Sequence, residues 1–195
     1  LSRSIRDLKV AVIGTGRIGS IVGKIFARGF DAEVVAYDIE PNEQCQTYLT
    51  YKDSVTEVVK DADIVTVHIP GSKENDYLFD EDLFKAFKKG AVFINCARGS
   101  IVKTSALIEA LDNGTLKGAA LDTYEGEKGL IPSDQRGTEL KDDILTQLIE
   151  RQDVILSPHI AFYTDAAVEN LIVDALNATL EVLNTGDTAL RVNTL

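Results

Sequence analysis

The chain has 195 residues, of which 45% are hydrophobic and 26% charged, a composition typical of a globular protein with a full core. Its formal net charge of −11 argues against a nucleic-acid or anionic-membrane partner, because phosphate binding requires clustered cations. No apolar run approaches about 18 residues, so the sequence predicts no membrane span, and no export leader is visible. The two cysteines, Cys45 and Cys96, indicate a reducing compartment rather than a disulfide framework, and we expect a cytoplasmic protein.

Short apolar segments alternate with amphipathic segments along the chain, a pattern typical of βαβ units and a parallel sheet. The predicted strands are Lys9–Ile13, Glu33–Tyr37, a weak Thr47–Leu49, Ile64–His68, Ala91–Asn95, Gly118–Leu121 and Val154–Leu156. The predicted helices are Ile18–Arg28, Val55–Lys60, Glu81–Lys89, Ser105–Asn113 and Asp165–Leu183, followed by Gly29, Gly90, Gly114 and Gly186 at or near their ends. The acidic stretch Thr123–Asp143 is predicted to be a functional or mobile loop. We expect one domain over residues 1–195, a doubly wound α/β fold with about seven parallel strands and helices on both faces.

A glycine-rich turn, Gly14-Thr15-Gly16-Arg17-Ile18-Gly19, joins the first predicted strand to the first predicted helix. Gly14 permits the tight turn, Gly16 allows a pyrophosphate to approach the backbone, and Gly19 lets the helix pack closely on the strand. The amide groups at the helix N-terminus favour the phosphates. This pattern is a weak signal by itself, because a glycine-rich turn can also be purely structural.

A carboxylate at the end of the next strand strengthens the interpretation. Asp38 lies 19 residues beyond Gly19, where an acid accepts hydrogen bonds from the adenosine ribose hydroxyls. It would repel a 2′-phosphate, and Ile39 and Glu40 offer no arginine to bind one. The sequence therefore predicts a Rossmann-type dinucleotide site that prefers NAD to NADP, with FAD as a weaker alternative.

Other residues at predicted strand ends point to the same crevice, because ligands bind at the carboxyl ends of parallel strands. His68 is interpreted chiefly as a partly buried imidazole that lines the cleft, rather than as a catalytic group. Asn75, on the loop after Pro70, could hydrogen-bond the cofactor, and Asp122 could meet its nicotinamide end. The alternative for Asp122 is a carboxylate that caps a loop or a helix.

Three charged residues follow three different strands: Arg98, Glu127 and His159. The Arg98 guanidinium offers a planar set of donors that matches a carboxylate or a phosphate. A carboxylate beside a histidine favours the imidazolium form, which suits an acid–base group. Each residue alone has a structural alternative: a salt bridge for Arg98, a solvated loop acid for Glu127 and a surface imidazole for His159. Together, on a dinucleotide-binding fold, they favour a hydride-transfer enzyme that acts on an anionic substrate.

The sequence closely resembles the D-isomer-specific 2-hydroxyacid dehydrogenases, and within them the D-lactate dehydrogenase branch. The resemblance runs from about residue 8 to residue 191 and is carried by VIGTGRIG (12–19), VVAYD (34–38), DADIVTVHIP (61–70), FINCARGSIV (93–102), GAALDTYEGE (118–127) and SPHIAFYT (157–164). Several such blocks in one order are far more specific than the glycine turn. The AFYT segment and the acidic stretch after residue 127 are similar to the lactate branch rather than to the phosphoglycerate or glycerate branches.

The resemblance implies a role for each candidate residue. Arg98 would bind the substrate carboxylate and polarise the keto oxygen, His159 would donate the proton during reduction, and Glu127 would be its carboxylate partner. Tyr163 would lie near the substrate. The residues expected at the NAD site, from the motif and the resemblance together, are Gly14, Gly16, Arg17, Ile18, Gly19, Asp38, His68, Pro70, Asn75, Cys96, Ala97, Arg98 and Asp122. No metal is expected.

The chain departs from the family pattern in two ways. Arg17 and Thr123 replace residues that are commonly His and Val, and Ile160 stands where the family often has Thr, without affecting the mechanism. The larger departure is the absence of the N-terminal region that builds a substrate domain in the family. We expect residues 1–8 and 184–195 to lead toward that domain, and a cleft with only one wall cannot exclude water.

The resemblance implies that the enzyme interconverts pyruvate and D-lactate with NAD, and that it forms a homodimer through this domain. Two alternatives stay open. One is a dehydrogenase for bulkier 2-keto acids, such as D-2-hydroxyisocaproate dehydrogenase. The other is a non-catalytic module that senses NAD(H), as in corepressors of the family.

Overall fold

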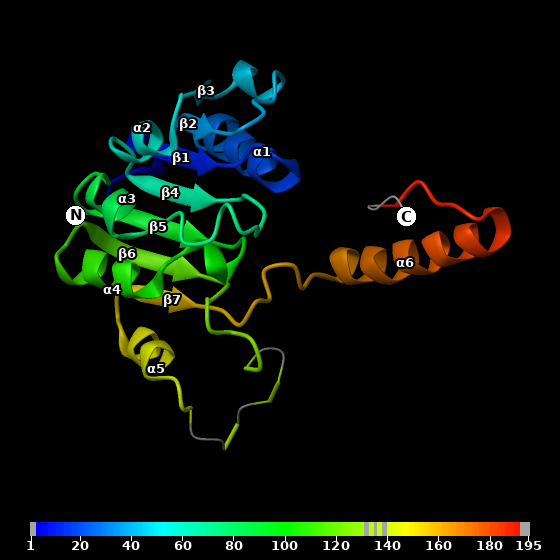
Figure 1. Ribbon diagram of the computed structural model, residues 1–195. Helices are drawn as coiled ribbons and strands as arrows, with labels where there is room; N and C mark the ends of the chain where they lie inside the picture. Colours follow the sequence, from blue (N-terminus) through cyan, green and yellow to red (C-terminus); the bar gives the residue numbers. More distant parts are fainter. Residues whose placement is uncertain (1–2, 131–132, 135, 138–139, 192–195) are drawn as a thin grey trace. The chain divides into compact units, whose positions relative to one another are not determined.

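The computed structural model describes residues 3–130, 133–134, 136–137 and 140–191, and the chain forms two units, residues 1–159 and 160–195. The first unit is built on a parallel sheet of seven strands in the order β3-β2-β1-β4-β5-β6-β7 (Figure 1). The strands are β1 (Lys9–Ile13), β2 (Glu33–Tyr37), β3 (Thr50–Tyr51), β4 (Ile64–Val67), β5 (Ala91–Asn95), β6 (Leu116–Leu121) and β7 (Val154–Leu156). The predicted fold class and strand number are confirmed.

In the first unit a short helix precedes β1, and further helices lie between the strands. They are η1 (Ile5–Asp7), α1 (Arg17–Lys24), η2 (Ile25–Gly29), η3 (Cys45–Thr47), α2 (Val55–Val59), α3 (Glu81–Lys85), η4 (Gly99–Ile101), α4 (Thr104–Asp112) and α5 (Asp143–Glu150). The second unit contains α6 (Asp165–Thr185), which is capped by the Thr164 hydroxyl and ends at left-handed Gly186. None of the helices in the described residues is both long and apolar enough to cross a membrane.

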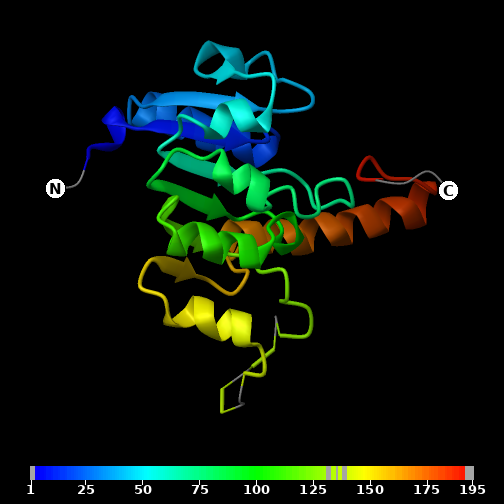
Figure 2. The same ribbon diagram turned by 60° about the vertical axis from the view of Figure 1, so that its left-hand side comes forward.

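Alternate residues of the central strands point to opposite faces of the sheet. Ala11 and Ile13 of β1 face a large apolar core that includes side chains of α2, α3, α4 and α5. Val10 and Val12 face a smaller core on the other side, against η2. Figure 2 shows α4 (green) and α5 (yellow) side by side along the first of these faces. Helices therefore cover both faces, as predicted, and leave the strand ends to the loops.

The predicted weak strand Thr47–Leu49 is wrong. Residues up to 47 form the short helix η3, and β3 begins only at Thr50. Cys45 and Leu49 are 1% and 6% exposed and both belong to the smaller core. Side chains four residues apart share one face on a helical turn, and they also share one face on a strand. The spacing of the apolar residues alone could therefore not decide between a helix and a strand.

The ends of two predicted helices also differ from the prediction, and helix α5 was not predicted. The first helix does not end at a left-handed Gly29, because it widens into η2 and the left-handed residue is Asp31, with φ 57°. Helix α3 is shorter than predicted, since a tighter turn after it buries the ring of Phe87. Helix α5 starts at the end of the predicted loop, where the carboxylate of Asp142 caps it by accepting a hydrogen bond from the Leu145 amide at 2.9 Å. Residues 131–132, 135 and 138–139 of that loop lie outside the described residues.

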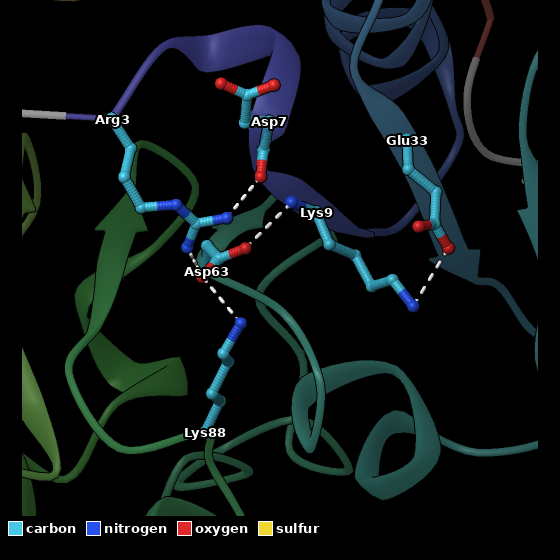
Figure 3. A network of polar contacts seen from close by, with 6 residues as sticks. All are labelled: Arg3, Asp7, Lys9, Glu33, Asp63 and Lys88. Atoms are coloured by element: carbon cyan, nitrogen blue, oxygen red, sulfur yellow. Dashed lines mark hydrogen bonds and ion pairs between the residues drawn. The ribbon is translucent and has the colours of Figure 1, made fainter.

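One carboxylate ties together three segments at the amino-terminal edge of the sheet (Figure 3). Asp63, just before β4, accepts hydrogen bonds from Arg3 Nη1 at 2.8 Å, from Lys88 Nζ at 2.7 Å and from the backbone amide of Lys9 at 2.9 Å. Its backbone also bonds to Lys9 and Val92 of the flanking strands. Burial works against ionisation of Asp63, but these hydrogen bonds outweigh burial and lower its pKa.

Replacing Asp63 with Asn should lower the free energy of unfolding by about 1–3 kcal/mol at pH 7, because an amide offers one acceptor oxygen to three donors. The pKa of Asp63 is lowered in the folded protein, so its contribution is present above the unfolded pKa of about 3.9 and is lost as the pH falls through the folded value. Urea unfolding should therefore separate the parent from the variant at pH 7, and the difference should shrink as the pH falls through the lowered pKa of Asp63.

The matched control is Asp61→Asn, which neutralises an exposed acid two residues away. It should change stability by less than about 0.5 kcal/mol. Equal losses in the two variants at pH 7 would contradict the structural role of Asp63.

Candidate active site

The glycine-rich turn between β1 and α1 is as tight as its sequence predicts. Gly14 has φ +91°, and a Cβ there would lie 2.8 Å from the Ile69 side chain and 2.9 Å from the His68 carbonyl group. A Cβ at Gly19 would lie 1.9 Å from the Gly14 oxygen, so this position requires glycine for packing. A Cβ at Gly16 would meet nothing within 4 Å, which leaves the backbone open to a ligand.

The N-terminus of α1 is available to an anion. Gly16 is its N-cap and has no side chain with which to accept a bond from the first amides of the helix. The helix dipole adds a partial positive charge at this end. Arg17 and Ile18 follow directly, and both side chains are exposed. These features fit the pyrophosphate of a dinucleotide.

Asp38 lies beside this turn, at the end of β2. Its Oδ2 accepts hydrogen bonds from the Thr15 amide at 2.6 Å and from the Thr15 hydroxyl at 3.0 Å. Its Oδ1 accepts a bond from the Glu40 amide at 3.0 Å. The carboxylate is therefore fixed against the glycine turn, and Oδ1 keeps acceptor capacity for a ribose hydroxyl.

The loop after β4 contains three of the predicted residues. Burial lowers the pKa of His68 to about 4, and its Nε2 lies 2.9 Å from the Thr66 hydroxyl. At neutral pH this imidazole is uncharged and paired, which favours a lining role over acid–base chemistry. The Asn75 side chain donates to the Pro70 carbonyl at 2.8 Å and holds the loop closed on itself.

Arg98 projects from the loop after β5 and is exposed. Its Nη1 donates to the Ala97 carbonyl at 2.7 Å, and no ion pair among the described residues includes it. Its stem packs beside Gly71, where a Cβ would lie 2.8 Å from Arg98 Cγ. The salt-bridge alternative thus finds no partner in the described part of the chain, and the guanidinium keeps its remaining donors for an anionic ligand.

Sequence reasoning missed the residue that shapes this loop. Asn95 is fully buried at the end of β5. Its side chain donates to the Arg98 carbonyl at 2.9 Å and accepts from the Ala97 amide at 3.0 Å. The signal that could have identified Asn95 is a polar residue at the end of an apolar strand, because a buried side-chain amide requires hydrogen-bond partners.

His159 and Glu127 form the pair that the sequence predicted. The distance from His159 Nδ1 to Glu127 Oε1 is 3.0 Å, and the two side chains are 33% and 22% exposed. Glu127 Oε2 accepts a further bond from the Tyr124 amide at 3.2 Å. With Nδ1 engaged by the carboxylate, Nε2 is the ring nitrogen left to exchange a proton with a ligand.

Backbone contacts connect the loops that hold these groups. His159 has a left-handed φ of 54°, and its amide donates to the Asp122 carbonyl at 2.8 Å. The amide of Asp122 donates to the Asn95 carbonyl at 2.9 Å. A Cβ at Gly99 would lie 2.1 Å from the backbone of Tyr124, so the Arg98 and Glu127 loops are in direct contact. The structure therefore brings the loops of Arg98, Glu127 and His159 together at one edge of the sheet.

The structure also describes the surroundings of the other predicted residues, which are Asp122, Cys96 and Tyr163. The Asp122 carboxylate is 4% exposed and accepts a 2.5 Å bond from the Ser157 hydroxyl. Desolvation and the negative charge of Asp122 raise the pKa of the Cys96 thiol, so it stays protonated at neutral pH. Tyr163 lies in the second unit and is 72% exposed there. No cluster of three or more His, Cys, Asp or Glu side chains suited to a metal occurs in the described residues.

Comparisons with known proteins agree with this geometry. The family model described as D-isomer specific 2-hydroxyacid dehydrogenase, NAD binding domain, matches residues 1–161. The D-lactate dehydrogenase of Streptococcus pyogenes serotype M1 is 50% identical over 191 residues, which are 98% of this chain and 58% of that protein. The crystal structure of a D-lactate dehydrogenase from Treponema pallidum matches with a TM-score of 0.93 at 35% identity, over 100% of this chain and 58% of that one.

A D-lactate dehydrogenase from Lactobacillus jensenii, whose structure was determined with NAD+, has a TM-score of 0.92 at 34% identity and the same coverage of 100% and 58%. The chain thus spans less than two thirds of the length of each of these relatives. The family model nevertheless matches well over half of the chain. The glycine turn, Asp38 and the strand order fit the cofactor named in that model. The chain therefore belongs to the D-isomer-specific 2-hydroxyacid dehydrogenase family and contains its NAD-binding domain.

Proposed function

We propose that the intact protein reduces pyruvate to D-lactate, reversibly, with NADH as the reductant. The observation that carries the proposal is the 3.0 Å contact between His159 and Glu127, at the same sheet edge as an exposed arginine without an ionic partner in the described residues. The names of the relatives, D-lactate dehydrogenases of matching domain structure, support the choice of substrate.

Each of the site residues has a separate role in the proposed reaction. NADH, when bound at the glycine turn and Asp38, supplies the hydride for the keto carbon. Arg98 binds the substrate carboxylate, and its positive charge stabilises the negative charge that develops on the keto oxygen. His159 donates a proton from Nε2 to that oxygen, while the Glu127 carboxylate orients the ring through Nδ1. In the oxidation direction His159 accepts the proton.

A second domain is part of this proposal. The chain spans 58% of the length of its relatives, and one wall of a cleft does not exclude water from a hydride transfer. We propose that residues 1–8 and 184–195 lead to that domain. The large apolar side chains that are exposed on α6, considered by itself, support a partner surface for this helix; they are Leu171, Ile172, Val173, Leu176, Leu180, Val182 and Leu183.

NADH oxidation by the intact protein should be fastest with pyruvate in a panel of 2-keto acids that also contains 2-ketoisocaproate. His159→Gln should lower kcat roughly 10²- to 10⁴-fold, because the proton donor is lost. The dissociation constant for NADH should stay within about twofold of the parent value, since His159 acts on the substrate oxygen. Steady-state kinetics and NADH fluorescence titration measure the two quantities.

The alternatives predict other outcomes of the same panel. A clear preference for 2-ketoisocaproate would indicate a dehydrogenase for bulkier substrates. NADH binding without turnover of any keto acid would indicate an NAD(H)-sensing module. Activity of His159→Gln within a few-fold of the parent would exclude the assigned proton donor.

Replacing Asp38 with Ala should weaken NADH binding about 10- to 100-fold, because a hydrogen bond to a charged group contributes about 1.5–3 kcal/mol. It should also strengthen NADPH binding, because the charge that repels a 2′-phosphate is removed. Fluorescence titration with both coenzymes measures the preference. An unchanged preference for NADH over NADPH would refute the ribose contact.

We also propose a homodimer that forms through this domain in the cytoplasm. Ile21 of α1 and Ile25, the first residue of η2, are 60% and 51% exposed, although they are large and apolar. The strand register places Ile155 of β7, 73% exposed, in one row with Val12 across the sheet and therefore on the same face as η2. Apolar side chains gathered on one face support a protein partner, and the two free cysteines support a reducing compartment.

A charged residue introduced on this face should dissociate the dimer into monomers. Ile25→Asp should shift the molar mass in light scattering from the dimer toward the monomer at micromolar concentration, because an unpaired carboxylate would be buried in the interface. Lys24→Asp places the same residue on another side of the helix and should leave the mass unchanged. A monomeric parent protein, or a dimeric Ile25→Asp, would contradict the proposed interface.

A further inference from the structure

A chain of hydrogen bonds leads from strand β3 to the carboxylate of Asp38. Tyr51 Oη lies 2.7 Å from Thr15 Oγ1. Thr15 in turn donates to Asp38 Oδ2 from its hydroxyl at 3.0 Å and from its amide at 2.6 Å. At the outer end, the amide of Asn42 donates to Tyr51 Oη at 3.0 Å. Four segments of the chain thus meet in one polar array at the ribose end of the glycine turn.

The number of available protons fixes the direction of each bond. The Thr15 hydroxyl has a single proton, and the carboxylate of Asp38 only accepts, so Thr15 donates to Asp38. Tyr51 must then donate to Thr15. Its other acceptor, the Asn42 carbonyl, lies at 3.5 Å, a much poorer hydrogen-bond distance than 2.7 Å. Every donor in the array therefore points toward Asp38.

The surroundings keep this array intact at neutral pH. Thr15 is 2% exposed, so water does not compete well for its hydroxyl. Burial raises the pKa of Tyr51, against the opposing effect of its bonds to Thr15 and Asn42, so the phenol keeps the proton that it donates. Among the described residues, Asp38 accepts from three donors: two of them act on Oδ2, and the third, the Glu40 amide, acts on Oδ1. Oδ1 has the greater remaining capacity for a ligand.

We propose that Thr15 and Tyr51 are positioning residues that set the preference for NAD over NADP. They hold the Asp38 carboxylate in one orientation, so that it accepts from the ribose hydroxyls and cannot turn away from a 2′-phosphate. This inference rests on the proposed ribose contact of Asp38. It differs from a general stabilising role, because loss of the array should change the discrimination between two coenzymes and not only their common affinity.

Binding titrations of NADH and NADPH to the intact protein test the inference without reference to turnover. Tyr51→Phe and Thr15→Val should each lower the ratio of the NADPH to the NADH dissociation constant about 3- to 10-fold, as expected for one hydrogen bond. Thr15→Ser keeps the hydroxyl and should stay within about twofold of the parent ratio. The double variant should lower the ratio no further than Thr15→Val alone, because both act through one array.

Tyr48→Phe is the matched control. It also removes a bonded hydroxyl, which lies 2.9 Å from both the Ser20 carbonyl oxygen and Cys45 Sγ and, within the described part of the chain, makes no hydrogen bond to Thr15 or Asp38. It should leave the ratio unchanged. An equal fall of the ratio in Tyr48→Phe, or a parent-like ratio in a folded Tyr51→Phe, would overturn the inference.

Asp38→Ala tests the ribose contact separately from the positioning role of Thr15 and Tyr51. If Asp38→Ala lowers the ratio and Tyr51→Phe does not, the ribose contact stands and the positioning role fails. If Asp38→Ala leaves the ratio unchanged, the ribose contact fails and the positioning role fails with it. Thermal unfolding of each variant confirms that the titrated protein is folded.

Discussion

Parallel pairing of all seven strands places every carboxyl end at the same edge of the sheet, and the candidate site depends on this constraint. The glycine turn follows β1, Asp38 follows β2, and Arg98, Glu127 and His159 follow β5, β6 and β7. These residues are far apart in the sequence. The common direction of the strands brings them to one edge.

The two edges of the sheet use charge in opposite ways. At the amino-terminal edge, the Asp63 carboxylate accepts three hydrogen bonds, two of them from cations, and its lowered pKa shows that the charge is stabilised there. At the carboxyl edge, Arg98 has no ionic partner among the residues described. A charged side chain that forms no ion pair within the fold is available to bind a ligand of opposite charge. The first arrangement stabilises the domain, whereas the second leaves a cation for the proposed substrate carboxylate.

The parts of the site that the sequence predicted share one property: their signal is local. The glycine turn, Asp38 after its strand and the Ser157–Pro158–His159 segment can each be recognised within a few residues. Their meeting could be predicted because the carboxyl ends of parallel strands lie at one edge of the sheet, and the His159–Glu127 contact agrees with it. The resemblance to a family added the roles, which spacing alone did not supply.

What could not be predicted depends on tertiary contacts. Tyr51 and Thr15 are 36 positions apart in the sequence, and no local sequence pattern predicts the hydrogen bond between them. Asn95 shapes the Arg98 loop from within an otherwise apolar strand. The strand predicted at Thr47–Leu49 failed because a four-residue apolar spacing suits a helical turn as well as a strand, so the buried Cys45 and Leu49 fit both structures.

The central claim is that one sheet edge presents a carboxylate-binding arginine and a proton-donating histidine to the same substrate. A crystal structure of the intact protein with NADH and oxamate, a pyruvate analogue that is not reduced, tests it most directly. The account predicts the oxamate carboxylate on the Arg98 guanidinium and its amide oxygen within hydrogen-bond distance of His159 Nε2. Oxamate bound away from Arg98, or a His159 ring that contacts neither Glu127 nor the analogue, would contradict it.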